Sequence, residues 1–295
     1  MLADEVMALL QPRARSGEET WIVDGTVGMG GHAERLLEIS APATRLLGLD
    51  RDPEALARSA RRLSRFGARV VLRHGTFREL AQHAADAGVA RAAAVLLDLG
   101  LSSYQIDESG RGFSFQGTEP LDMRFDPTAG ATAADLVNTL RESELADLLW
   151  ESGGEPHARR IAKRIAERRV RQPLRTAGDL VAAVRAAVPR AAWPRKIHVA
   201  TRTFQALRIA VNEESASLAA ALPQAAELLS HGSRLGVIAF HSGEDRTVKH
   251  TFRELAAQGY GELEPSPIRP AADEVRANPR ARSARLRVLE RLVAA

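Results

Sequence analysis

Three acidic residues, each placed directly after a short and mainly apolar run, are the best candidates for chemistry in this 295-residue chain. They are Asp24, Asp50 and Asp98. If the apolar runs are neighbouring parallel strands, their ends meet at one edge of a sheet, where α/β proteins bind ligands. The pattern predicts a nucleotide-type cofactor site that contains three carboxylates.

A glycine-rich segment follows the first of these acids, in the order Gly25-Thr-Val-Gly-Met-Gly-Gly-His32. Gly28-x-Gly30-x-x-Ala33 matches the dinucleotide fingerprint, and Asp50 is placed to accept hydrogen bonds from ribose hydroxyls. Glycines let the backbone approach a ligand where a Cβ atom would clash. The segment is therefore compatible with a nicotinamide dinucleotide, with S-adenosylmethionine, or with a turn that only tightens strand-to-helix packing.

The position of Asp24 helps to separate these alternatives. Its carboxylate stands immediately before the glycine turn, where it would repel a pyrophosphate. S-adenosylmethionine carries no phosphate, and its ammonium and sulfonium groups are cations. We therefore favour the methyl donor over the nicotinamide cofactor.

The elements that must position these residues alternate between strand and helix. Short apolar runs predict strands near residues 21–24, 45–50, 70–74 and 93–99, and amphipathic stretches predict helices near 31–39, 53–66 and 77–87. Asp52 before Pro53 is typical of a helix N-cap followed by its first turn. This βαβ rhythm predicts an α/β fold with a doubly wound parallel sheet.

The alternation stops after the fourth predicted strand. Residues 107–200 contain no convincing strand, and helical patterns lie near 132–150, 155–171 and 176–188. A strand signal returns at Leu235–Phe240. We expect a Rossmann-like domain from residues 1–106 and 201–295, with a mainly helical insertion at 107–200 for substrate recognition.

Basic residues are concentrated in the predicted insertion. Between Glu151 and Val211 there are 14 Lys or Arg residues and four acids, whereas the whole chain has a net charge of +4. One cationic region predicts a polyanion-binding surface, although an arginine-rich composition is the alternative. The residues expected to contact RNA are Arg160, Lys163, Arg164, Arg168, Arg171 and Arg202.

The composition excludes several classes of mechanism. The chain has no cysteine, which excludes disulfides, thiolate metal sites and a cysteine nucleophile. His32 and His241 lack further ligand-like spacing, so no metal is predicted. No apolar run approaches the ~20 residues that span a bilayer, and no secretory signal is visible. We expect a cytoplasmic protein without a membrane partner.

Several side chains near the predicted site could handle a nucleobase. Asp98 could orient an exocyclic amine and accept its proton, or cap the turn that follows it. Gln105 could hydrogen-bond the cofactor or a base. Candidates for stacking on the base are the aromatic residues Tyr104, Phe113, Phe115 and Phe240, with core packing as the alternative.

Eight motifs stand in the chain in a fixed order. They are Asp24-Gly-Thr-Val-Gly-Met-Gly-Gly-His32, Leu49-Asp-Arg-Asp-Pro53, Leu97-Asp-Leu-Gly-Leu-Ser-Ser103, Arg111-Gly-Phe-Ser-Phe115, Pro120-Leu-Asp-Met-Arg124, Ala200-Thr-Arg-Thr-Phe-Gln-Ala-Leu-Arg-Ile209, Phe240-His-Ser242 and Asn278-Pro-Arg-Ala-Arg-Ser283. In this order they closely resemble the RsmH (MraW) family of bacterial ribosomal RNA methyltransferases. The resemblance runs from about Leu2 to Arg291.

The resemblance implies a cytoplasmic enzyme that uses S-adenosylmethionine to methylate N4 of a cytidine in the decoding centre of 16S rRNA. It implies an assembled small ribosomal subunit as the partner, and a homodimer is left open. The cofactor contacts carried over by matching motif are Gly30, Gly31, His32, Asp50, Phe77, Asp98 and Gln105. Phe77 would pack against adenine.

Two rival functions belong to other classes. A nicotinamide oxidoreductase accounts for the glycine fingerprint and Asp50, but not for Asp24 or the cationic insertion. A non-enzymatic RNA-binding or ribosome-assembly factor accounts for the cationic insertion, but leaves the three strand-end acids unexplained.

Overall fold

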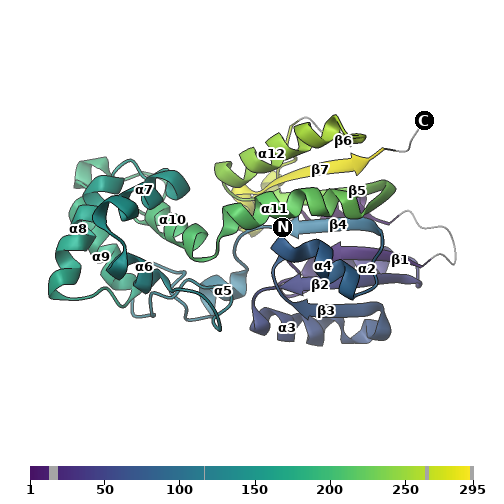
Figure 1. Ribbon diagram of the computed structural model, residues 1–295, viewed down its shortest axis with the longest axis horizontal. Helices are drawn as coiled ribbons and strands as arrows, with labels where there is room; N and C mark the ends of the chain where they lie inside the picture. The colour runs from purple at the N-terminus through teal and green to yellow at the C-terminus, as the bar shows by residue number, and fades with distance from the viewer. Residues whose placement is uncertain (13–18, 116, 263–265, 293–295) are drawn as a thin grey trace. The chain divides into compact units, whose positions relative to one another are not determined.

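The computed structural model describes residues 1–12, 19–115, 117–262 and 266–292 (Figure 1). The chain forms two compact units. The first comprises Met1–Gly100 and Ser215–Ala295, and the second comprises Leu101–Glu214. Each unit has its own hydrophobic core.

The first unit is built on a seven-stranded sheet with the order β3-β2-β1-β4-β5-β7-β6. The strands are β1 (Thr20–Asp24), β2 (Thr44–Asp50), β3 (Val70–His74), β4 (Ala92–Asp98), β5 (Leu229–Ala239), β6 (Tyr260–Glu262) and β7 (Arg285–Arg291). Strands β1 to β5 are parallel to one another, whereas β7 runs antiparallel to both β5 and β6. The doubly wound α/β fold is confirmed, but the sheet is mixed and not wholly parallel.

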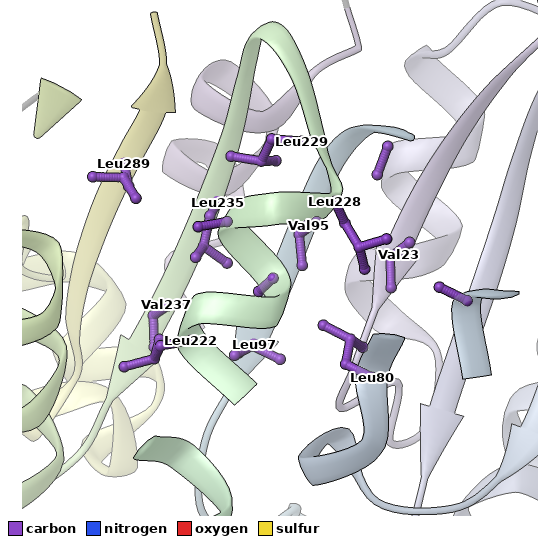
Figure 2. Close-up of a cluster of buried hydrophobic side chains, with 14 of the residues drawn as sticks. Val23, Leu80, Val95, Leu97, Leu222, Leu228, Leu229, Leu235, Val237 and Leu289 are labelled. Atoms are coloured by element: carbon purple, nitrogen blue, oxygen red, sulfur yellow. The ribbon is translucent and has the colours of Figure 1, made fainter. Parts of the chain in front are cut away.

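Helices cover both faces of this sheet because successive strand residues point to opposite sides. Val23 and Val95 contribute to one core, whereas Ile22 and Leu96 contribute to the other. The first core, shown in Figure 2, is completed by residues of α4 (Leu80–Asp86), α11 (Glu214–Leu228) and α12 (Ser242–Ala256). The second is completed by residues of α1 (Ala3–Leu10), α2 (Gly31–Ile39) and α3 (Pro53–Leu63).

The N-terminus of α3 forms as its sequence predicts. The carboxylate of Asp52 accepts a hydrogen bond from the backbone N–H of Glu54, and Pro53 occupies the first helical position. Short 3₁₀ segments and one further helix complete this unit: η1 (Ser64–Arg69), η2 (Phe77–Glu79), α13 (Ala272–Ala277) and η4 (Pro279–Ser283).

In the described part of the second unit, the named secondary-structure elements are all helices. They are α5 (Ser103–Asp107), α6 (Ala133–Thr139), α7 (Glu142–Gly153), α8 (Ala158–Arg171), α9 (Ala177–Ala187), η3 (Arg190–Ala192) and α10 (Thr201–Val211). A long loop occupies most of the described stretch between α5 and α6. One isolated β-bridge joins Pro120 and Thr176. In the described residues, no helix has both the length and the apolarity needed to cross a membrane.

The boundaries of this unit differ from the expected 107–200. It begins at Leu101 and ends at Glu214 because α10 packs into its core, where Phe204, Ala206 and Leu207 are buried. The motif residue Arg111 forms hydrogen bonds within this unit. Its guanidinium donates to the carbonyl oxygens of Arg124 at 3.1 Å and Phe125 at 2.7 Å.

Candidate active site

The three strand-end acids lie at the switch point of the sheet. Strands β1 and β4 are neighbours, although β2 and β3 come between them in the sequence. Asp24 ends β1, Asp98 ends β4, and Asp50 ends β2 on the other side of β1. Crevices outside the carboxyl ends of strands at such a point are where open α/β sheets bind ligands.

The glycine-rich turn after β1 takes its shape from backbone conformations that favour glycine. Gly28 and Gly30 have φ values of 52° and 79°, in the left-handed region. Gly30 is the N-cap residue of α2. A Cβ atom at Gly25 would lie 2.5 Å from a methyl carbon of Leu97, so the turn also sits closely against β4.

Asp50 holds this turn from the neighbouring strand. Its Oδ2 accepts a hydrogen bond from the Gly28 N–H at 2.8 Å, and its Oδ1 accepts one from the Asp52 N–H at 2.9 Å. Burial raises the pKa of Asp50 to about 6, against the lowering effect of these backbone hydrogen bonds. Since each carboxylate oxygen has a second lone pair, Asp50 can still accept a ligand hydroxyl. Its role in shaping the turn was not anticipated from the sequence.

Asp24 is a buried carboxylate with an unusual titration. The residue is 2% exposed, and its Oδ1 accepts a hydrogen bond from the Thr26 N–H at 3.1 Å. Burial raises the pKa of Asp24 to about 7, whereas His32 and the Thr26 hydrogen bond oppose the rise. The nearby charges of Asp98 and Asp50 raise it further. A ligand cation beside this group would stabilise its ionised form.

Asp98 and His32 form a pair with unsatisfied polar atoms. Nε2 of His32 lies 3.4 Å from Oδ2 of Asp98. The other oxygen of Asp98 and Nδ1 of His32 are both buried without a hydrogen-bond partner in the described part of the chain. Buried polar atoms are almost always paired in native proteins, so these two atoms fit a site that a polar ligand completes.

Thr26 connects the two strands at the switch point. Its hydroxyl oxygen accepts a hydrogen bond from the Asp98 N–H at 2.6 Å and lies 3.5 Å from Oδ1 of Asp24. A role for Thr26 was not expected from the sequence. Its position two residues after a strand-end acid, inside the glycine turn, was the available signal.

Phe77 lies beside the glycine turn, as expected from its position after β3. Its Cβ would be 3.2 Å from a Cβ atom placed on Gly25. The ring is half-buried and packs against the core that contains Val23 and Leu97. Gly31, the first residue of α2, is exposed.

The loop after β5, where the sequence places an aromatic, an imidazole and two acids, is held by the buried acid Glu244. Oε2 of Glu244 accepts a hydrogen bond from the Phe240 N–H at 2.8 Å. Nδ1 of His241 accepts from the N–H groups of Gly243 and Glu244, which leaves the ring proton on Nε2, 3.1 Å from Oε1 of Glu244. The half-buried Phe240 ring lies 3.4 Å from where a Cβ of Gly100 would be, two residues after Asp98.

The remaining candidate aromatics and Gln105 belong to the second unit. Tyr104 and Phe113 are buried, at 3% and 8% exposure. Phe115 stacks on His198 with ring centroids 4.7 Å apart and meets Phe204 edge-on. In the structure these three rings pack against other residues of the second unit.

Gln105 has a local structural role. Its side-chain oxygen accepts a hydrogen bond from the Ser102 N–H at 3.0 Å, and its own N–H donates to the Ser102 hydroxyl at 3.2 Å. This capping box starts α5. A cofactor contact by Gln105 remains a prediction.

Comparison with known proteins places the chain in a family. The family model described as "MraW methylase family" matches residues 1–292. The chain belongs to the MraW methylase family. A relative from Syntrophotalea carbinolica named "Ribosomal RNA small subunit methyltransferase H" is 47% identical over 99% of this chain and 97% of its own length. A relative of the same name from Thermomicrobium roseum is 49% identical over 92% of this chain and 87% of its own.

The cationic residues expected on α8 of this MraW methylase divide into two groups. Arg168 is half-buried and tied to the start of α9, because its guanidinium donates to the backbone oxygen of Asp179 at 2.7 Å and pairs with its carboxylate. Arg160, Lys163 and Arg164 are exposed, and Arg164 lies 3.6 Å from Glu167. Arg171 and Arg202 are also exposed. Arg168 therefore has a structural role, whereas the other five side chains face solvent.

The described residues contain no group of three or more His, Asp or Glu side chains arranged to hold a metal ion. His32 and His241 each face a carboxylate instead: Asp98 for His32, and Glu244 for His241.

Proposed function

We propose that this MraW methylase transfers a methyl group from S-adenosylmethionine to N4 of a cytidine in the decoding centre of 16S rRNA. The observation that carries the proposal is the site at the switch point, where the buried Asp24 stands beside the incompletely paired Asp98 and His32. The names of the curated relatives support small-subunit rRNA as the substrate.

The residues at this edge fit the parts of S-adenosylmethionine by their chemistry. Asp24 would face the ammonium group, and Asp50 would accept from the ribose hydroxyls. Phe77 would pack on adenine, with Gly30, Gly31 and His32 lining the turn and Gln105 adding a polar contact. When bound, S-adenosylmethionine supplies an electrophilic methyl group.

The same observations disfavour the nicotinamide alternative. Asp24 is directly beside the glycine turn that would have to bind a pyrophosphate, and its ionised form would repel that group. In dinucleotide sites this turn instead presents helix N–H groups to the phosphates without a competing acid.

The amine that is methylated must lose a proton as it gains the methyl group. Its lone pair is delocalised into the cytosine ring, so the enzyme has to orient the N–H groups and accept a proton. Asp98 is the proposed acceptor because one of its oxygens is unpaired and buried. His32, 3.4 Å from the other oxygen, stabilises the charge of Asp98 before transfer and can share the proton afterwards.

The attack is direct, without a covalent enzyme intermediate. Methylation at C5 of cytosine normally requires a cysteine nucleophile, and the chain has none. Holding the amine in line with the methyl group can itself lower the barrier by several kcal/mol. Of the four candidate aromatics, Phe240 is the proposed stacking partner for the base. It is half-buried, and its ring lies against Gly100, two residues after Asp98.

The exposed cations of the helical unit would bind the rRNA backbone, and the assembled small subunit in the cytoplasm is the proposed substrate. The test is transfer of radiolabelled methyl groups from S-adenosylmethionine to small subunits that lack the modification, followed by separation of 16S rRNA from ribosomal proteins. We expect label in the rRNA. Binding of NADH, with no binding of S-adenosylmethionine and no label, would contradict the proposal.

A further inference from the structure

A second cationic region lies C-terminal to α8. No acid occurs between Asp179 and Glu213, and the segment carries six basic residues. Arg208 is committed to Glu214, with two nitrogen–oxygen contacts of 2.7 and 2.8 Å. The other five are exposed: Arg185, Arg190, Arg195, Lys196 and Arg202. Repulsion among them is therefore not offset by acids of the same segment, which favours an anionic partner.

A cavity of about 80 Å³ lies between this segment and the residues just before α8. Its apolar wall comes from Val188, Pro194, Ile197 and Val199, and its polar lining comes from Glu155, His157, His198 and Arg202. The cavity is too small for a whole nucleotide but can admit one edge of a planar ring. An apolar wall with a few converging polar groups is typical of a small-molecule site.

Glu155 determines what this cavity can bind. The residue is 3% exposed, and its Oε1 accepts a hydrogen bond from the His157 N–H at 3.0 Å. Each carboxylate oxygen has two lone pairs, so the Glu155 carboxylate can still accept hydrogen bonds from a ligand in the cavity that it lines. A carboxylate accepts hydrogen bonds and repels anions, so the cavity suits the donor edge of a neutral ring and not a phosphate.

The ring of His198 lines the cavity. Its Nδ1 accepts a hydrogen bond from the Ala200 N–H at 3.2 Å, and one ring face stacks on Phe115. Burial and the nearby charge of Arg185 lower the pKa of His198, which keeps the ring neutral at physiological pH. Arg202, which donates to the Gly154 oxygen at 3.5 Å, also lines the cavity.

We propose that this cavity binds the base of an unpaired nucleotide of the RNA substrate, with guanine preferred and its phosphate held by Arg202 and Arg185. Guanine presents two adjacent donors, N1–H and N2–H, which match a carboxylate. Adenine and cytosine place an acceptor beside their amine, and uracil flanks its single N–H with two acceptors. The inference rests on the proposed function only in taking RNA as the ligand.

The test is NMR titration of the full chain with each of the four nucleoside 5′-monophosphates, following the ring signals of His157 and His198. We expect GMP to shift these signals at millimolar concentrations and to bind about tenfold more tightly than AMP, CMP or UMP. In Glu155→Gln, which keeps an oxygen for the His157 N–H, the preference for GMP should disappear. Glu151→Gln, an exposed acid of α7, is the matched control and should retain it.

Three results would overturn this inference: equal shifts from all four nucleotides, the same shifts from inorganic phosphate alone, or an unchanged GMP preference in Glu155→Gln. Each of these can occur while S-adenosylmethionine binding and rRNA methylation remain intact, so failure of the cavity is distinct from failure of the proposed function. Conversely, selective GMP binding can be observed without the cofactor.

Discussion

At the scale of single residues, the site places three carboxylates at one sheet edge, and the most deeply buried of them is Asp24. Asp24 and Asp50 both have raised pKa values, about 7 and about 6, and in each case burial is the main cause. Such groups destabilise the protein when they ionise without a partner. Their retention at a sheet edge is understandable if a bound cation compensates for the cost, because functional sites are where such shifts cluster.

Asp24→Asn tests this balance between stability and binding. The folded pKa exceeds the unfolded value of 3.8, so protonation of Asp24 favours the folded state. Protonation of Asp24 stabilises the folded state fully below pH 3.8, and this stabilisation is lost as the pH rises from 3.8 through 7. The loss in the free energy of unfolding is up to about 4 kcal/mol, at 1.36 kcal/mol per pKa unit. Without ligand, Asp24→Asn should melt at a higher temperature than wild type at pH 8, and the difference should shrink as the pH falls, until the two proteins converge below about pH 3.8.

The same variant should bind S-adenosylmethionine at least about tenfold more weakly at pH 8, as measured by calorimetry, because the ammonium loses its anionic partner. Wild-type affinity should also fall as pH drops below 7. Asp4→Asn, an exposed acid paired with Arg35, is the control for both measurements. If Asp24→Asn bound the cofactor as tightly as wild type, Asp24 would not contact the ammonium.

Asp98→Asn tests the proposed proton acceptor. It preserves the shape of the side chain but removes its basicity, so kcat for rRNA methylation should fall by about 10² to 10⁴. Single-turnover assays with saturating cofactor separate this effect from weaker binding. Turnover like that of wild type would remove Asp98 from the mechanism.

At the scale of elements, the strands that carry the site and the core of β5 were predictable, whereas β6 and β7 were not. Strands β1, β2 and β4 are buried on both faces and therefore consist of short apolar runs, whose polar ends stand out. Strand β7 has the sequence Arg285-Leu-Arg-Val-Leu-Glu-Arg291, in which residues of high helix propensity occupy an antiparallel strand. Only pairing with β5 and β6 makes this segment a strand, and pairing is not a local property.

The candidate site was predictable in its residue types but not in its hydrogen bonds. Asp50 was expected to serve the ribose alone, and the structure shows that it also supports the glycine turn. The contributions of Thr26 and Glu244 depend on contacts between β1 and β4 and within the β5–α12 loop. Such contacts follow from the fold and cannot be derived from sequence spacing.

Two arginines of the basic helix α8 should differ in their contribution to stability. Arg168→Gln should lower the free energy of unfolding by about 1–2 kcal/mol, because it removes the hydrogen bonds that join α8 to the first turn of α9. Arg160→Gln, on the exposed part of the same helix, should leave it within about 0.5 kcal/mol of wild type. Urea denaturation measures both, and equal values for the two variants would contradict the assignment.

At the scale of the whole molecule, the two compact units divide the chemistry. The first contains the candidate active site, and the second contains the basic stretch from Glu151 to Val211, with 14 Lys or Arg residues and four acids. The sequence located this division by the loss of strand signals and the rise in basic residues. It placed the ends of the helical unit too far inward, since the packing of α10 into that core is a tertiary effect.

Charge reversal on the helical unit should change the salt dependence of RNA binding. The triple variant Arg160→Glu, Lys163→Glu and Arg164→Glu should bind the rRNA more weakly. Its plot of log affinity against log salt concentration should also be shallower, with a slope smaller in magnitude by about 2, because each lost phosphate contact to single-stranded RNA accounts for ~0.7. Reversal of Arg61, Arg253 and Arg276, exposed residues of the first unit, is the control. Identical slopes for the two triple variants would contradict the proposal that the exposed basic residues of α8 contact RNA phosphates.

The most direct test of the central claim is nucleoside mass spectrometry of 16S rRNA from unmodified small subunits after incubation with this protein and S-adenosylmethionine. We expect one new nucleoside, N4-methylcytidine, which maps to the decoding centre and is absent from reactions with Asp98→Asn. A methyl group at C5 of cytosine, on another base or at a 2′-oxygen would contradict the proposed chemistry. No methylated nucleoside from a protein that binds the cofactor would contradict the proposed substrate.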